Sequence, residues 1–155
     1  MPASSILLLE TDPVAGETIR TVLDGVGYDL EIVTDVADLL KRAPKHSLII
    51  VDATPEGTTP ADVCREVRGT SSLAAIPVLC MSKDDDVEER IRFLEAGADD
   101  VVAKPFDNRE LEARVEALLL RFQRSRGMMP VFSADGLTVA RVRRVVAVYS
   151  PKGGV

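Results

Sequence analysis

Five short, largely apolar runs alternate with segments whose apolar residues recur every three or four positions. The runs occupy residues 6–9, 30–33, 48–51, 76–81 and 100–103. The central run, Leu-Ile-Ile-Val at 48–51, contains no polar residue, as expected of a strand buried on both faces of a parallel sheet. Right-handed connections between parallel strands place the intervening helices on both faces. The sequence therefore predicts an α/β fold with a doubly wound five-stranded parallel sheet.

Local signals predict where the helices begin and which faces they bury. Asp12-Pro13, Thr34-Asp35 and Thr59-Pro60 each offer a capping side chain, twice with proline in the first turn. Asp107 and Glu110 are predicted to form a capping box for the last helix. Two apolar faces follow from helical spacing: Val87, Ile91 and Leu94 in the fourth helix, and Leu111, Val115, Leu118, Leu119 and Phe122 in the last.

Composition narrows the class of protein. The 155 residues are 46% hydrophobic and 28% charged, which is typical of a soluble globular domain. The net charge of −6 argues against a nucleic-acid partner, and no apolar run is long enough to span a membrane. The amino terminus lacks the positive flank of a secretory signal, and Cys64 and Cys80 form neither a disulfide framework nor a zinc pattern. We expect two reduced core thiols and a cytoplasmic protein.

Polar residues follow four of the predicted strands. Glu10 comes after the first strand with Asp12 nearby, Asp52 after the third, Ser82 after the fourth and Lys104 after the fifth. Each alone would be an ordinary solvated residue, but the carboxyl ends of parallel strands meet at one crevice. Carboxylates suit Mg²⁺, and an aspartate beside it is a plausible phosphoryl acceptor. A hydroxyl and an ammonium can hold the phosphoryl oxygens.

The segments 6–13, 48–52, 76–82 and 97–106 resemble the receiver domain of bacterial two-component response regulators. The block Gly-Ala-Asp-Asp-Val-Val-Ala-Lys-Pro-Phe at 97–106 is the most specific part, and the likeness covers residues 4–123. The resemblance implies a flavodoxin-like fold with strand order 2-1-3-4-5 and Asp52 as acceptor of a phosphoryl group from a histidine kinase or phosphotransfer protein. It also implies Ser82 as the switch hydroxyl and Lys104 as the phosphate partner.

The same resemblance implies a Mg²⁺ site formed by Glu10, Asp52 and the Thr54 carbonyl, with Asp12 as a further candidate ligand. Thr11 stands where the family has a second adjacent acid, so we expect weak Mg²⁺ binding unless Asp12 compensates. Asp12 is also the predicted helix cap, and the two roles compete. Lys83 replaces a small residue after the switch hydroxyl, where it could crowd the phosphoryl pocket or stand in for lost metal charge.

These departures leave two hypotheses. The first is an atypical receiver phosphorylated at Asp52 with weakened Mg²⁺ dependence. The second is a phosphorylation-independent docking or dimerisation domain, supported by Thr11, by Lys83 and by Val101, which replaces the family's aromatic residue in the fifth strand. In the first case the fourth helix, fifth strand and last helix are expected to contact a partner, an attached ATPase domain or a second copy. A small enzyme of this fold is disfavoured because the single histidine, His46, precedes the central strand.

The remaining residues have a different pattern. We expect a receiver domain over 1–123, a linker over 124–144, and the first strand with an incomplete Walker A loop of an ATPase domain over 145–155. Ser-Pro-Lys-Gly-Gly-Val at 150–155 resembles the start of the deviant Walker A loop of ParA/MinD-type ATPases, and receiver–ATPase fusions resemble the CpaE/TadZ proteins. The loop lacks the second lysine and the helix that hold phosphate, so no ATPase activity is expected of this chain. The alternative is a basic tail in which Lys-Gly-Gly occurs by chance.

Overall fold

The computed structural model describes residues 4–83 and 85–135, with side chains as far as residue 123. It divides into two compact units, Met1–Leu119 and Leu120–Val155. The first unit contains all five strands and the candidate site. Of the second unit, the structure describes residues 120–135, which belong to the last described helix.

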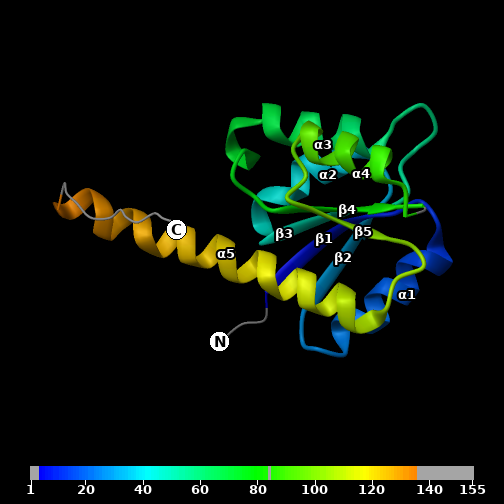
Figure 1. Ribbon diagram of the computed structural model, residues 1–155, viewed down its shortest axis with the longest axis horizontal. Helices are drawn as coiled ribbons and strands as arrows, with labels where there is room; N and C mark the ends of the chain where they lie inside the picture. Colours follow the sequence, from blue (N-terminus) through cyan, green and yellow to red (C-terminus); the bar gives the residue numbers. More distant parts are fainter. Residues whose placement is uncertain (1–3, 84, 136–155) are drawn as a thin grey trace. The chain divides into compact units, whose positions relative to one another are not determined.

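A parallel sheet of five strands forms the centre of the first unit (Figure 1). The spatial order is β2-β1-β3-β4-β5, with every neighbouring pair parallel. This confirms the predicted flavodoxin-like, doubly wound α/β fold. The strands are β1 (Ser5–Leu9), β2 (Asp29–Val33), β3 (Leu48–Val51), β4 (Val78–Ser82) and β5 (Asp100–Ala103).

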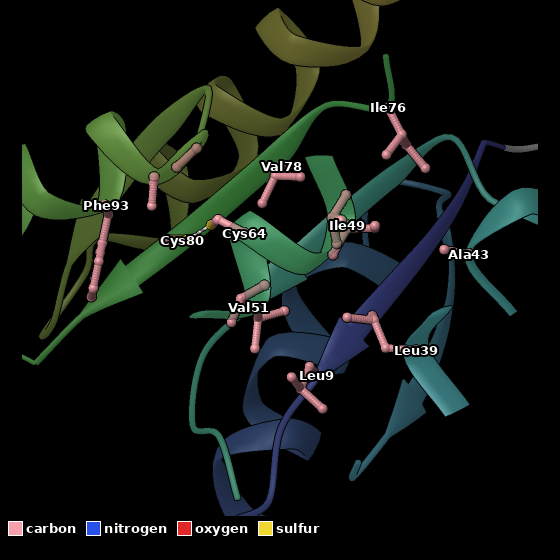
Figure 2. Packing of buried hydrophobic residues seen from close by; sticks show 14 of the residues in the cluster. Leu9, Leu39, Ala43, Ile49, Val51, Cys64, Ile76, Val78, Cys80 and Phe93 are labelled. Atoms are coloured by element: carbon pink, nitrogen blue, oxygen red, sulfur yellow. Dashed lines mark hydrogen bonds between the residues drawn. The ribbon is translucent and has the colours of Figure 1, made fainter. Parts of the chain in front are cut away.

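Helices cover both faces of the sheet (Figure 1). On one face, side chains of α2, α3 and α4 join one buried cluster, part of which is drawn in Figure 2. On the other face, α1 and the first turns of α5 enclose a second cluster that contains Ile19, Leu23, Leu111 and Val115. The helices are α1 (Pro13–Asp24), α2 (Val36–Arg42), α3 (Pro60–Gly69), α4 (Val87–Ala96) and α5 (Asn108–Asp135), with short 3-10 turns η1 (Ala43–Lys45) and η2 (Ser71–Leu73).

The predicted helix starts are confirmed where capping side chains are present. Asp12 accepts a hydrogen bond from the Val14 N–H, and Asp35 caps α2. Thr59 and Asp62 form a complete capping box at α3, with Pro60 in the first turn. These bonds satisfy backbone donors that have no partner within the helix, so each start is fixed by adjacent residues.

Two predictions about α4 and α5 were wrong. The expected buried stripe of α4 is exposed, with Val87 at 59%, Ile91 at 44% and Leu94 at 43%, whereas Phe93 and Ala96 are buried. α4 has apolar residues on two faces, and the sheet covers only one of them.

α5 does not end near Phe122 but continues to Asp135, so residues 124–135 of the predicted linker are helical. Arginine, glutamine and methionine dominate the first turns after Phe122, and these residues favour a helix.

The capping box predicted for α5 is only partly formed. The Asp107 carboxylate accepts from the Arg109 N–H, while Glu110 pairs with Arg114. The predicted strand and Walker-like loop at 145–155, and the linker beyond residue 135, lie outside the described residues. Among the helices that the structure does describe, none combines the length and apolar character needed to cross a bilayer.

Candidate functional site

The register of the sheet brings the predicted site residues to one edge. Leu9 is paired with Val51, so Glu10 and Asp52 leave neighbouring strands at the same level, and the Asp52 N–H donates to Leu9 O at 3.0 Å. Ser82 is paired with Ala103, and the Lys104 N–H donates to Ser82 O at 2.9 Å. Four residues far apart in sequence therefore gather at the carboxyl ends of β1, β3, β4 and β5.

The side chains of Asp52 and Lys104 form an ion pair inside this edge. Lys104 Nζ lies 2.8 Å from Asp52 Oδ2, and the Asp52 side chain is only 5% exposed. The lysine is 31% exposed, so its ammonium reaches inward from the rim. Ser82 is buried at the end of the adjacent strand. The arrangement places a carboxylate in a nearly dry position with a cation beside one of its oxygens.

Glu10 is the second buried acid of the site, at 2% exposure. Its Oε2 accepts a hydrogen bond from the Asp12 N–H at 3.1 Å. Burial raises the pKa of Glu10 to about 8, and hydrogen bonding to and repulsion by the Asp52 carboxylate add to the rise. The raised pKa makes Glu10 harder to ionise beside the Asp52 carboxylate.

Asp12 and Thr11 do not complete an acidic cluster. The Asp12 carboxylate accepts from the Val14 N–H at 3.0 Å as the cap of α1, and Thr11 is exposed. Across residues 4–83 and 85–123, no three histidine, cysteine or acidic side chains gather closely enough to bind a metal. In this structure Asp12 is the cap of α1, and its role as a metal ligand stays a prediction.

A smaller donor set still fits a hard cation. Within the described residues, Glu10 Oε1 is a buried side-chain oxygen without a hydrogen-bond partner, and Asp52 Oδ2 faces the Lys104 ammonium at 2.8 Å. Carboxylate and carbonyl oxygens are the ligands that Mg²⁺ prefers. Thr54 lies in the loop after β3, which is closed by the Thr54 Oγ1–Thr58 O hydrogen bond of 2.5 Å. Glu10, Asp52 and the Thr54 carbonyl remain the candidate ligands.

A cavity of about 670 Å³ opens beside Asp52, between the loop after β3 and helix α4. Four cationic side chains line it: Arg65, Lys83, Arg92 and Lys104. Lys83 was singled out from the sequence, but Arg92 and Glu89, which also line the cavity, were not. The spacing of Glu89 and Arg92 in the sequence does not indicate that they face the cavity, because the packing of α4 against the sheet determines this orientation.

The strand order and the buried aspartate–lysine pair at the carboxyl edge are those expected of receiver domains, a class of signalling phosphoacceptors rather than enzymes. The chain belongs to the response regulator receiver domain family, whose model matches residues 6–116. The resemblance stated from the sequence is thereby confirmed for the receiver part.

Relatives and solved structures agree with this family. The chain is 36% identical over 121 residues to the transcriptional regulatory protein GltR of Pseudomonas aeruginosa, a match covering 77% of this chain and 50% of GltR. It is also 36% identical over 118 residues to the DNA-binding response regulator MtrA of Mycolicibacterium smegmatis, covering 75% of this chain and 50% of MtrA. The chain thus spans about half the length of these relatives.

Two solved structures bear on the fold and the metal. A response regulator from Chloroflexus aurantiacus superposes with a TM-score of 0.72 at 28% identity, covering 76% of this chain and 98% of that one. The receiver domain of sensor histidine kinase PA1611 from Pseudomonas aeruginosa superposes with a TM-score of 0.68 at 25% identity, covering 76% and 98%. That domain holds a magnesium ion in its active-site cleft. Receiver domains therefore bind Mg²⁺ in the active site.

Proposed function

We propose that this domain accepts a phosphoryl group on Asp52 from a histidine kinase or a phosphotransfer protein. The observation that carries the proposal is the 2.8 Å pair between Asp52 Oδ2 and Lys104 Nζ at the buried strand edge. A carboxylate oxygen bonds to phosphorus while the bond from phosphorus to the donor's imidazole nitrogen breaks, and the imidazole takes up a proton. Lys104 and the Ser82 hydroxyl then bind the phosphoryl oxygens.

Mg²⁺ fits the site but binds weakly in this proposal. Glu10, Asp52 and the Thr54 carbonyl would hold the ion, which supplies positive charge against the negative phosphoryl oxygens when bound. Because the pKa of Glu10 is raised, a proton competes with the ion for its carboxylate. The Asp12 carboxylate caps α1 and Thr11 is neutral, so the donor set is one acid short.

Lys83 compensates for part of the missing metal charge. It lines the same cavity as Asp52 and Lys104, directly after the Ser82 hydroxyl. An ammonium group near the phosphoryl oxygens provides charge stabilisation that a small residue cannot. Of the two roles considered for Lys83, the proposal adopts charge compensation, because the cavity leaves space beside Asp52.

The output surface is proposed to be the face formed by α4, β5 and the start of α5. Val87, Ile91 and Leu94 expose an apolar stripe on α4, and such stripes are typical of contact surfaces. A second copy of the chain or an attached ATPase domain would contact this face. The proposal of an ATPase domain as partner is based only on the motif at 150–155. We also propose that the protein is cytoplasmic.

A phosphorylation-independent docking domain is the second candidate function. The incomplete acid set around Glu10 and Asp52 favours it, as does the exposed stripe of α4. In that case the Asp52–Lys104 pair would be a structural remnant and the domain would dimerise or bind its partner constitutively.

A titration with Mg²⁺ and beryllofluoride, followed by backbone amide NMR, separates the two functions. Phosphoacceptor function predicts shifts at Ser82 and Lys104 in the natural chain and none in Asp52→Asn. Lys83→Ala should require more Mg²⁺ for the same shift, whereas Lys45→Ala, an exposed lysine before β3, should not. Absence of any response of the natural chain, at every Mg²⁺ concentration, would refute phosphoacceptor function and leave docking.

A further inference from the structure

The two cysteines of the chain face each other in the core between helix α3 and strand β4. Cys64 Sγ lies 3.2 Å from Cys80 Sγ, and a dashed line marks this contact in Figure 2. Both thiols are free and fully buried, and they are 16 residues apart in sequence. The sequence predicts two reduced core thiols, and the fold brings these two thiols into contact.

The geometry leaves little distance for a covalent bond to cover. A disulfide has a sulfur–sulfur distance of roughly 2.05 Å, so the two atoms need to approach by only about 1 Å. The two thiols also differ chemically. The hydrogen bond from Cys80 lowers the pKa of Cys64, with the charge of Arg68 adding to the effect, whereas the same hydrogen bond raises the pKa of Cys80. Cys64 is therefore the better nucleophile of the pair.

We propose that Cys64 and Cys80 form a reversible intramolecular disulfide with low-molecular-weight disulfides as the oxidant. The Cys64 thiolate bonds to one sulfur of the small disulfide, whose sulfur–sulfur bond breaks and releases one thiolate. Cys80 then loses its proton and bonds to Cys64 Sγ, releasing the second small thiol. Two protein thiols are oxidised and one small disulfide is reduced to two thiols, so atoms and electrons balance.

The proposed bond joins two elements that flank the phosphoacceptor edge. Cys80 lies two residues before Ser82 in β4 and is paired in register with Val51, the residue before Asp52. Cys64 lies in α3, just after the loop that contains Thr54. Oxidation would fix α3 to β4 and oppose unfolding, because cross-linking restricts the unfolded chain more than the folded one.

Equilibration with mixtures of reduced and oxidised glutathione tests the proposal. The full chain is held in native buffer or in denaturing urea, trapped with N-ethylmaleimide, and measured by intact mass and peptide mapping. An equilibrium measurement is appropriate because buried thiols react slowly but their equilibrium does not depend on the rate. The proposal predicts an equilibrium constant for Cys64–Cys80 oxidation at least about tenfold higher in the native chain than in urea.

Matched variants and a second readout complete the test. Cys64→Ala and Cys80→Ala should form only mixed adducts with glutathione and no intramolecular bond. The oxidised natural chain should unfold at a higher urea concentration than the reduced chain, because the two equilibria belong to one thermodynamic cycle. A native chain that stays reduced where the urea-unfolded chain oxidises would overturn the proposal, and so would a lower urea midpoint after oxidation. Neither outcome depends on phosphorylation of Asp52.

Discussion

Replacing Arg68 by methionine tests whether one guanidinium joins three segments of the domain. Arg68 lies in the last turn of α3. Its Nε donates to Gly97 O at 2.9 Å, and one terminal nitrogen donates to Ile76 O at 2.6 Å and Ala74 O at 3.1 Å. The other terminal nitrogen pairs with Asp99 at 2.6 Å. Methionine retains much of the aliphatic stem, so the substitution removes mainly charge and hydrogen bonds.

The magnitude follows from which acceptors are shielded from water. A hydrogen bond from a charged donor contributes about 1.5–3 kcal/mol, and less where water can replace it. The Gly97 and Ile76 carbonyls are in part-buried contacts, whereas the Ala74 contact and the Asp99 pair are exposed. Two shielded bonds, discounted for partial access of water, give a loss of about 3 kcal/mol in the free energy of unfolding.

Urea unfolding monitored by circular dichroism measures this loss, with Arg65→Met as the control. Arg65 lies one turn earlier on α3 and pairs only weakly, at 3.4 Å, with the exposed Asp62. Its replacement should cost less than about 0.5 kcal/mol. If Arg68→Met lost no more stability than Arg65→Met, the guanidinium would not join the segments, and the reasoning from its contacts would be refuted.

Other perturbations have equally defined outcomes. In metal-free buffer, Glu10 has a pKa of about 8 in the folded chain and its ordinary value of 4.5 in the unfolded chain. Between these two pH values the folded chain binds more protons than the unfolded chain. The free energy of unfolding should therefore fall by up to about 1.4 kcal/mol per pH unit between pH 4.5 and about pH 8. Urea titrations at several pH values should show this slope, and Glu10→Gln should flatten it. Gly97→Ala should destabilise by at least about 2 kcal/mol, because φ is +121° and the new Cβ would lie 2.7 Å from a neighbouring side chain; Gly69→Ala, which meets nothing within 4 Å, should not. Thermal unfolding should show that Ile91→Gln changes stability by less than about 0.5 kcal/mol and Phe93→Ala by about 3 kcal/mol or more; equal losses would contradict the observed orientation of α4.

The sequence predicted the structure correctly where adjacent residues determine it or where a whole segment is apolar. The run 48–51 is buried throughout, and Thr59 caps α3 with Pro60 in the first turn, as the adjacent residues predict. The edge of the sheet was predictable for the same reason: a charged residue such as Asp52 ends an apolar strand, and parallel strands end together. The meeting of Asp52 and Lys104 follows from that rule.

Sequence reasoning failed where tertiary packing chooses between equivalent alternatives. Helix α4 offers Val87, Ile91 and Leu94 on one face and Phe93 with Ala96 on another, and only the position of the sheet decides which is buried. The cavity beside Asp52 depends on that choice. The contact of Cys64 with Cys80 also required the fold, because nothing in a separation of 16 residues indicates that a helix and a strand bring two sulfurs together.

Phosphorylation of Asp52 is tested most directly by intact-mass measurement after incubation with acetyl phosphate and Mg²⁺. The natural chain should gain the mass of one phosphoryl group, peptide mapping should place it at Asp52, and Asp52→Asn should gain none. A smaller gain should also occur at Mg²⁺ concentrations that would not saturate a site with a complete set of acids. The reason is that Lys83 and Lys104 line the same cavity and supply positive charge. An unchanged mass of the natural chain at saturating Mg²⁺, or a phosphoryl group found on another residue, would contradict the account.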